Sequence, residues 1–314
     1  MADVLIALIP VFIAGIYAFG LSALWVILVS VASSVLFEFL YNKITKQPNT
    51  IGDLSAVVTG AILAINLPAT VPLWIPVLGS AFAIILVKCL FGGLGHNFMN
   101  PALGARVFLL MSFAGIMTAY PTTVRLIKGF STVVSEATPL QAVASGEEIN
   151  WATMILEMHS GCIGEASVIA ILIGFAYLLI RRTIASKIPL IYVASTVVFV
   201  VLIAIFRGKA ETLTLNYIVA QICGGGLLLG AVFMATDYVT SPATPMGQAI
   251  YAVLLGLITA LIRLVSSGAE GVSYAIIIGN MLSPLIDRFL SPAYFGKGSR
   301  SFAEPKKSKE ATAK

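Results

Sequence analysis

The sequence predicts an all-α polytopic membrane protein with about ten transmembrane helices in two inverted five-helix repeats. Of its 314 residues, 59% are hydrophobic and only 11% are charged, whereas about a quarter of the residues of a soluble domain are charged. So few charges cannot cover a surface that faces water, so the chain is expected to fold in a lipid bilayer. The mean hydropathy of +0.99 supports the same conclusion.

Each long apolar run predicts one span. No charge lies between Asp3 and Glu38. One helix of that length would be about 50 Å long, against a hydrocarbon core of about 30 Å. The chain must therefore turn near Gly20, and this gives two spans. The ten spans are expected at about 4–19, 22–41, 54–67, 73–91, 99–118, 162–180, 188–206, 216–235, 248–265 and 271–290. The predicted regions are a first membrane half at 1–118, a loop at 119–161, a second half at 162–291 and a basic tail at 292–314.

The basic residues predict the orientation in the inner membrane. With both termini in the cytoplasm, 14 of the 19 lysines and arginines fall on the cytoplasmic side, and such a bias sets membrane topology. That set includes Lys88 and Arg106, whereas Arg263 is counted outside. The 119–161 loop then faces outward. The basic tail is expected to lie at the cytoplasmic surface, and no nucleic-acid partner is expected.

Two segments about half a chain apart resemble each other. Gly-Ala-Ile-Leu at 60–63 is echoed by Gly-Ala-Val-Phe at 230–233, and Pro-Ala-Thr follows each, at 68–70 and 242–244. On the predicted topology the third span runs outward and the eighth inward, so the copies are inverted, an arrangement typical of transporters. Coincidence is the alternative, because these residue types are common in membrane helices.

Both copies also predict interrupted helices. The third span ends before Pro68, Pro72 and Pro76, and the eighth contains three glycines at 224–226. Unwound backbone at membrane depth survives only where protein or a polar cavity satisfies its amides and carbonyls. The breaks are therefore candidate sites for a cofactor or an ion, although glycines also suit tight helix packing.

Charge at bilayer depth costs about 3 kcal/mol or more, so acidic residues near the spans are functional candidates. Asp237, beside the broken eighth span, and Asp53, entering the third, are the candidates for ion handling. Glu38, Glu270 and Asp287 are expected at the interface beside basic residues. The acidic residues within or beside the spans are Glu38, Asp53, Glu165, Asp237, Glu270 and Asp287.

The cysteines and histidines do not suggest a metal centre. Cys89, Cys162 and Cys223 form no Cys-x-x-Cys pair, and three thiolates cannot supply the four ligands of an iron–sulfur cluster. Buried free thiols are expected, with a disulfide as the alternative. His96 is expected to be structural, because no second ligand stands at a metal-binding spacing.

Three stretches carry a family resemblance. They are Phe-Gly-Gly-Leu-Gly-His-Asn-Phe-Met-Asn-Pro-Ala-Leu at 91–103, Ser-Glu-Ala-Thr-Pro-Leu at 135–140 and Met-Ala-Thr-Asp-Tyr-Val-Thr-Ser-Pro at 234–242. In this order and spacing the chain resembles the D subunits of Rnf complexes, which are ion-pumping ferredoxin:NAD⁺ oxidoreductases. It is also similar to the homologous B subunit of the sodium-pumping NADH:quinone reductase. The resemblance extends from Asp3 to about Phe289.

The resemblance implies a covalent flavin. In these families Ser-Gly-Ala-Thr-x-Leu is the acceptor of a flavin transferase, which links FMN to the threonine oxygen through a phosphodiester bond. Ser135, Ala137, Thr138 and Leu140 match this pattern, whereas Glu136 replaces the glycine. Thr138 is the expected attachment point, in a loop that a soluble transferase can reach. Taken alone, so short a motif would be an ordinary Ser/Thr turn before a proline.

The resemblance further implies a second, non-covalent flavin, riboflavin, among the helices. Asn66, Asn100 and Thr236 are expected to line its pocket. The implied partners are Rnf subunits A, B, C, E and G, of which the FMN-bearing G subunit is nearest. The implied function is electron relay between ferredoxin and NAD⁺ coupled to Na⁺ or H⁺ translocation. The alternatives are a channel or secondary transporter for a small polar solute, and a purely structural protein of the complex without flavin.

Overall fold

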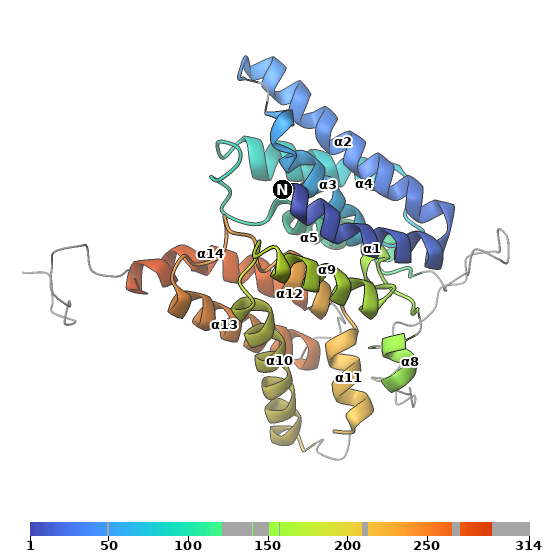
Figure 1. The fold of residues 1–314 in the computed structure, drawn as a ribbon, viewed down its shortest axis with the longest axis vertical. Helices are drawn as coiled ribbons and strands as arrows, with labels where there is room; N and C mark the ends of the chain where they lie inside the picture. The colour runs from blue at the N-terminus through green and yellow to red at the C-terminus, as the bar shows by residue number, and fades with distance from the viewer. Residues whose placement is uncertain are drawn as a thin grey trace, which may run out of the picture.

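The computed structural model describes residues 1–48, 50–120, 140, 151–156, 158–208, 213–265 and 271–290. These residues form helices and no β-strand (Figure 1). The helices long and apolar enough to cross a membrane are α1 (Ala2–Phe19), α2 (Leu21–Thr45), α10 (Lys187–Phe206) and α13 (Pro245–Val265). The pair α11 (Leu215–Cys223) and α12 (Leu227–Phe233), bent by 44°, is a further candidate span. The chain is therefore an all-α polytopic membrane protein.

The other helices of the described residues complete the bundle. They are α3 (Ser55–Ile65), α4 (Trp74–Ala81), α5 (Pro101–Ser112), α6 (Ala114–Met117), α8 (Trp151–Leu156), α9 (Val168–Ile180) and α14 (Val272–Leu290). The π-helical η2 (Phe82–Cys89) continues α4, and the 3₁₀ turns η1 (Ile51–Asp53) and η4 (Ile163–Glu165) precede α3 and α9. Each expected span coincides with a helix or a broken helix of this set.

The structure corrects the expected length of three spans. Helices α3, α5 and α9 have only 11, 12 and 13 residues. At 1.5 Å per residue they reach about 16 to 20 Å, less than a hydrocarbon core of about 30 Å. Asn66 and Pro68 end α3, and α9 starts late because η4 and an extended segment occupy the residues before it. Non-helical backbone therefore lies deep inside the bundle.

The turn predicted near Gly20 is confirmed. Gly20 has a φ of +74°, a left-handed conformation that glycine adopts without steric cost, and its N–H donates to Ile16 O at 2.8 Å. Helices α1 and α9 then pack antiparallel. Arg181, just after α9, pairs with Asp3 in the first turn of α1 at 3.2 Å. The antiparallel pair places the beginning of the chain beside the end of α9.

Helix contacts repeat between the two halves of the chain. Helix α2 packs against α3 and α4, and α10 packs against α12 and α13. Likewise η2 packs against α5, and α13 against α14. The halves meet through α1 with α9 and α5 with α14, which are corresponding helices, and Figure 1 shows α2 to α5 above and α10 to α14 below. This pattern, with α1 and α9 antiparallel, agrees with the predicted inverted repeat.

The close approach of α1 and α9 generates a first prediction. A Cβ at Gly174 would lie 2.4 Å from Ala7 O and 2.9 Å from the Phe233 ring. Overpacking of this kind typically costs about 1–3 kcal/mol. Gly174→Ala should therefore lower the melting temperature of the purified protein in detergent. The control is Gly115→Ala, where nothing lies within 4 Å of the added carbon; equal melting temperatures for the two variants would contradict the tight packing.

Candidate functional site

A cavity of about 140 Å³ lies at the end of the bundle where the chain begins. The starts of α1, α3 and α5 meet there with the ends of η2, α9 and α12. The polar lining residues are Ser55, Thr59, Lys88, Asn97, Asn100, Thr183, Thr236 and Asp237. Most other lining residues are apolar: Met1, Val4, Val58, Ile62, Leu94, Pro101, Leu178, Ile184, Val232, Phe233 and Val239. Such an apolar chamber with a few polar groups is typical of small-molecule sites.

The loop between η2 and α5 forms one wall of the cavity. Asn100 caps α5, because its Oδ1 accepts from the backbone N–H groups of Ala102 at 3.1 Å and Leu103 at 3.4 Å, and Pro101 suits the first helical position. Asn97 Oδ1 is buried and has no hydrogen-bond partner among the described residues. A buried amide oxygen without a donor is costly, so it marks a position where a ligand donor would be favourable.

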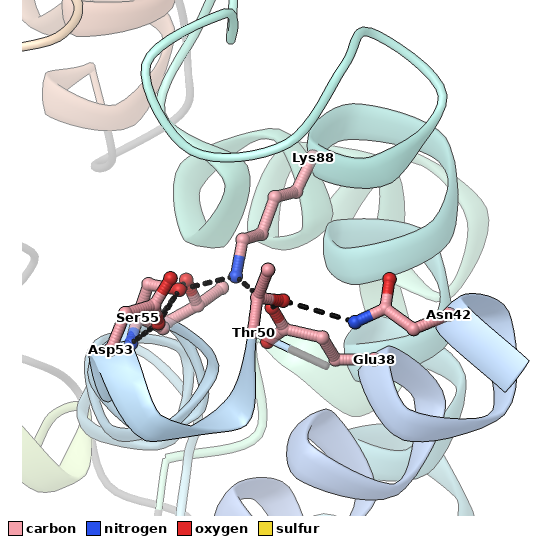
Figure 2. A network of polar contacts seen from close by, with 7 residues as sticks. Glu38, Asn42, Thr50, Asp53, Ser55 and Lys88 are labelled. Carbon is pink, nitrogen blue, oxygen red and sulfur yellow. Dashed lines mark hydrogen bonds and ion pairs between the residues drawn. The ribbon is translucent and has the colours of Figure 1, made fainter. Parts of the chain in front are cut away.

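A buried polar cluster forms a second wall (Figure 2). Lys88 reaches from η2 to Glu38 on α2, with an Nζ–Oε1 distance of 2.9 Å, and its ammonium also donates to Ser55 Oγ. Thr50 Oγ1 donates to the same Glu38 oxygen at 2.6 Å and accepts from Asn42 Nδ2 at 3.0 Å. Ser55 and Lys88 belong to both the cluster and the cavity lining.

The segment after α12 forms a third wall. Thr236 Oγ1 donates to Val232 O at 2.6 Å, which continues the helical direction by one turn. Asp237 Oδ1 accepts from Val239 N at 3.2 Å in the turn that follows. Both side chains line the cavity, together with residues from the start of α3. The cavity therefore has carboxyl and hydroxyl groups on one wall and an ammonium and amides on the others.

The end of α3 is capped deep in the bundle. Ile163 N donates to Leu67 O at 3.0 Å, and Cys162 Sγ donates to Asn66 O at 3.3 Å. Asn66 Oδ1 in turn accepts from Arg106 on α5. The terminal carbonyls of α3 are thus paired by the segment before α9, as backbone in a membrane requires.

The break between α11 and α12 is held by one arginine. Arg263 of α13 donates through Nη1 to the backbone and side-chain oxygens of Gln221, at 2.5 and 3.2 Å. Its Nη2 donates to Gly224 O at 3.0 Å and Gly225 O at 3.1 Å. The cation also faces the negative end of the α11 dipole, which is a favourable arrangement. Arg263 therefore supports the unwound backbone in place of helical hydrogen bonds.

The two breaks approach each other inside the bundle. Gly226, with a φ of +68°, starts α12. A Cβ there would lie 2.9 Å from Glu165 Oε1 and 4.0 Å from Arg106 Nη1. Glu165 and Arg106 are 5% and 4% exposed, so an acid and a base are both buried beside Gly226. The arrangement links α3, α5, η4 and α12 through charged groups.

Sequence comparisons identify the family of the chain. A model described as the NQR2, RnfD, RnfE family matches residues 1–296. The chain belongs to this family. The D subunit of the Na(+)-translocating ferredoxin:NAD(+) oxidoreductase complex of Acetobacterium woodii is 44% identical over 94% of this chain and 90% of its own length. The D subunit of the proton-translocating ferredoxin:NAD(+) oxidoreductase complex of Clostridium ljungdahlii is 36% identical over 94% of this chain and 91% of its own. The D subunit of the ion-translocating oxidoreductase complex of Actinobacillus succinogenes is 30% identical, with 95% and 93% covered.

In this family member the structure brings together three of the predicted site residues. Asn100, Thr236 and Asp237 line the same cavity. Asp53 joins it through Ser55, whose N–H and hydroxyl both donate to its Oδ1. Asn66 does not line this cavity: it is fully buried against Arg106 and Ile62 O, because its side chain serves the end of α3.

The predicted flavin attachment motif is only partly described. Ser135, Ala137 and Thr138 lie outside the described residues. Leu140 is described and is 5% exposed. Its Cβ lies 3.4 Å from where a Cβ on Gly224 would be, so the last residue of the motif packs against the α11–α12 break.

Several charged residues are placed differently from the prediction. Glu38, expected at the interface, is 1% exposed, because it pairs with Lys88 inside the bundle. Lys88 and Arg106, counted as cytoplasmic loop charges, are buried at 2% and 4% exposure, and Arg263, counted outside, binds the helix break. These three bases therefore carry no information about membrane sidedness. The sequence does contain a sign of this burial, because each of the three bases lies within a predicted span.

The cysteine prediction is confirmed: Cys89, Cys162 and Cys223 are buried free thiols. His96 lies in the glycine-rich loop and is exposed, with its ring 3.4 Å from the position of a Cβ on Gly92.

The helix break generates the second prediction. Arg263→Met would remove the donors to Gln221, Gly224 and Gly225. A buried carbonyl that loses its partner costs about 1–3 kcal/mol, so the variant should lose about 3 kcal/mol or more of stability. Thermal unfolding in detergent measures the loss.

The matched control for this prediction is Arg207→Met. Arg207 donates to a single carbonyl, Leu264 O, at an exposed position, so its loss should change stability by only about 0.5 kcal/mol. If the two arginine variants unfolded at the same temperature, Arg263 would not support the break.

Proposed function

We propose that this chain is the D-type membrane component of an ion-translocating ferredoxin:NAD⁺ oxidoreductase complex and that it relays electrons through flavin. The observation that carries the proposal is the match along nearly the whole chain to relatives that are named as the D subunits of such complexes. One of these relatives is named as Na⁺-translocating and the other as proton-translocating, so the proposed coupling ion is Na⁺ or H⁺.

The first proposed electron carrier is FMN bound to Thr138 by a phosphodiester. The match of Ser135, Ala137, Thr138 and Leu140 to the acceptor pattern supports it. Leu140 adds a spatial argument, because it packs on Gly224. Two residues of chain span at most about 7 Å, so an FMN linked two residues before Leu140 would attach close to the α11–α12 break.

The second proposed carrier is riboflavin, held without a covalent bond in the cavity. The flavin would supply the electron-carrying chemistry, and the protein its binding and orientation. The residues fit such a ring system: Asn97 Oδ1 is a buried acceptor without a donor, and Lys88 provides a cation. Val58, Ile62 and neighbouring apolar side chains would cover the faces of the ring and exclude water.

The two proposed flavins define an orientation. The cavity lies at the end of the bundle where α1, α3 and α5 begin. Leu140 lies at the α11–α12 break, which α11 approaches from the opposite end of the bundle. Lys43 and Lys46 at the end of α2, and Lys187 at the start of α10, lie on the cavity side, and basic residues near the ends of spans favour the cytoplasm. We therefore place the cavity and both termini on the cytoplasmic side of the inner membrane, and the 119–161 loop outside.

The proposed partners follow from this assignment. A flavin transferase would modify the outward loop, and Rnf subunits A, B, C, E and G would surround the chain in the bilayer. The G subunit, with its own threonine-linked FMN, would lie nearest to Thr138.

The second candidate function is a channel or secondary transporter for a small polar solute. Two broken helices that meet at Glu165 and Arg106 favour it, because transporters bind substrates at such breaks. It would leave the acceptor pattern around Thr138 without a role.

The third prediction separates these two functions. Thr138→Ala should abolish the flavin fluorescence of the denatured polypeptide on a gel, because the ester oxygen is lost, whereas Thr138→Ser should keep some of it. Thr132→Ala in the same loop is the matched control and should fluoresce like the parent chain. A dark parent band from cells that contain the transferase would sink the covalent flavin and favour the transporter.

The fourth prediction concerns the cavity. Asn97→Leu would replace the acceptor without a donor by an apolar side chain of similar size. Non-covalent flavin released from the purified complex by acid should then fall, while the fluorescence of the denatured band stays unchanged. Asn216→Leu, in the first turn of α11 and outside the cavity lining, serves as the control substitution. Unchanged riboflavin in Asn97→Leu would argue against this cavity.

A further inference from the structure

The Glu38–Lys88 cluster has the ligands of a cation site. The Lys88 ammonium is held by Glu38 Oε1 at 2.9 Å and by Ser55 Oγ, so a single positive charge is already coordinated by oxygen. Thr50 Oγ1 lies 2.6 Å from the same carboxylate oxygen. Carboxylate and hydroxyl oxygens are the ligands that hard cations prefer. Lys88 thus occupies a position whose surroundings would suit a metal ion of the same charge.

Only one oxygen of the Glu38 carboxylate has hydrogen-bond partners among the described residues. Its side chain is 2% exposed, and Oε2 has no hydrogen-bond partner among the described residues. A buried charged oxygen without a partner is strongly unfavourable. A donor network restricts the alternatives nearby: the Thr50 proton goes to Oε1, and the Ser55 proton goes to Asp53. A cation bound here would satisfy Oε2 without a rearrangement of the hydroxyl groups.

The net charge of the cluster also favours a bound cation. Glu38 and Asp53 are two carboxylates, and Lys88 is the one base of the cluster in the described part of the chain: it pairs with Glu38 and reaches Asp53 only through Ser55. The ionised cluster therefore carries one excess negative charge. If Lys88 left, Glu38 would be a buried charge without compensation, which is unstable. Departure of the ammonium therefore favours the binding of another cation at Glu38.

The Lys88 side chain could also turn towards the cavity. It lines the cavity as well as the cluster, so a negative charge in the cavity would attract its ammonium away from Glu38. Its position in the π-helical η2 is also notable, because such irregular helical turns occur frequently at functional sites.

We propose that Glu38, Thr50 and Ser55 form a Na⁺ site that the Lys88 ammonium fills until a negative charge in the neighbouring cavity draws it away. Na⁺ then binds both Glu38 oxygens and the two hydroxyl oxygens. The exchange transfers no electron or covalent group: one monovalent cation replaces another. It links a charge in the cavity to ion uptake at a distinct site, as coupling between sites requires. The inference rests on the proposed function only for the source of that negative charge.

The test is ²²Na⁺ binding to the complete complex in detergent, oxidised and reduced by dithionite. The parent complex should bind Na⁺ at this site about tenfold more tightly when reduced. Lys88→Met lacks the competing ammonium and should bind tightly in both states. The Glu38→Gln, Lys88→Met double variant keeps the cluster free of an unpaired base and should bind one Na⁺ fewer per complex than Lys88→Met in both states. Asp3→Asn, which removes a partly exposed carboxylate outside the cluster, should match the parent.

The outcomes are separable. If the double variant kept every Na⁺, or if Lys88→Met bound Na⁺ no more tightly than the oxidised parent, the site would be refuted. A tight site in Lys88→Met with no redox response in the parent would refute the displacement of Lys88. Flavin content measured on the same samples distinguishes these results from failure of the proposed function, because the absence of flavin would sink the electron relay itself.

Discussion

The rest of the structure depends on one constraint, which is that backbone polar groups inside a membrane protein must find partners within the protein. Two helices of this bundle break, and each break has a dedicated solution. Ile163 and Cys162 supply donors to the end of α3. Arg263 supplies four hydrogen bonds to the end of α11 and the glycines that follow. A charged side chain is tolerated there because three carbonyls and a helix dipole surround it.

The breaks in turn account for the short helices. A helix that ends halfway through the bundle leaves room for groups that a full span would exclude, and here Arg106 and Glu165 occupy that interior. The same shortening brings helix starts and helix ends together around the cavity. Polar residues gather at that end because helix termini leave backbone N–H and C=O groups unpaired, and polar side chains can bond to them. The binding chamber is thus a consequence of how the helices are interrupted.

The fold was largely predictable from sequence, because hydrophobic runs of suitable length have few alternatives in a bilayer. The turn at Gly20 and the breaks near Pro68 and at 224–226 followed from residue type alone. Helix lengths were not predictable, since hydropathy does not distinguish the 3₁₀ turn and extended residues at 162–167 from a turn of α-helix. The contacts that pair the backbone polar groups join segments far apart in the sequence, so only the structure shows them.

The site was predictable in part for a similar reason. Asn100, Thr236 and Asp237 were found because they stand in motifs next to helix breaks. Asn66 stands in the same kind of position, yet it serves the helix end, because Arg106 reaches it from another helix. Lys88 lies elsewhere than predicted because a charge beside an apolar run usually belongs to a loop, whereas here Glu38 compensates it inside the bundle. No linear pattern links it to Glu38, fifty residues away.

The positions of the charges suggest how electron transfer and ion movement could be joined in one chain. Lys88 pairs with Glu38 and also lines the cavity, so the charge of Glu38 and any charge in the cavity both act on its ammonium. In an interior of low dielectric that response is strong, because a buried charge without a counter-charge is unstable. Electron arrival in the chamber would therefore change the balance at Glu38 without any large helix movement. Coupling then requires only two alternative pairings of one flexible side chain, within a frame held rigid by capped helix breaks.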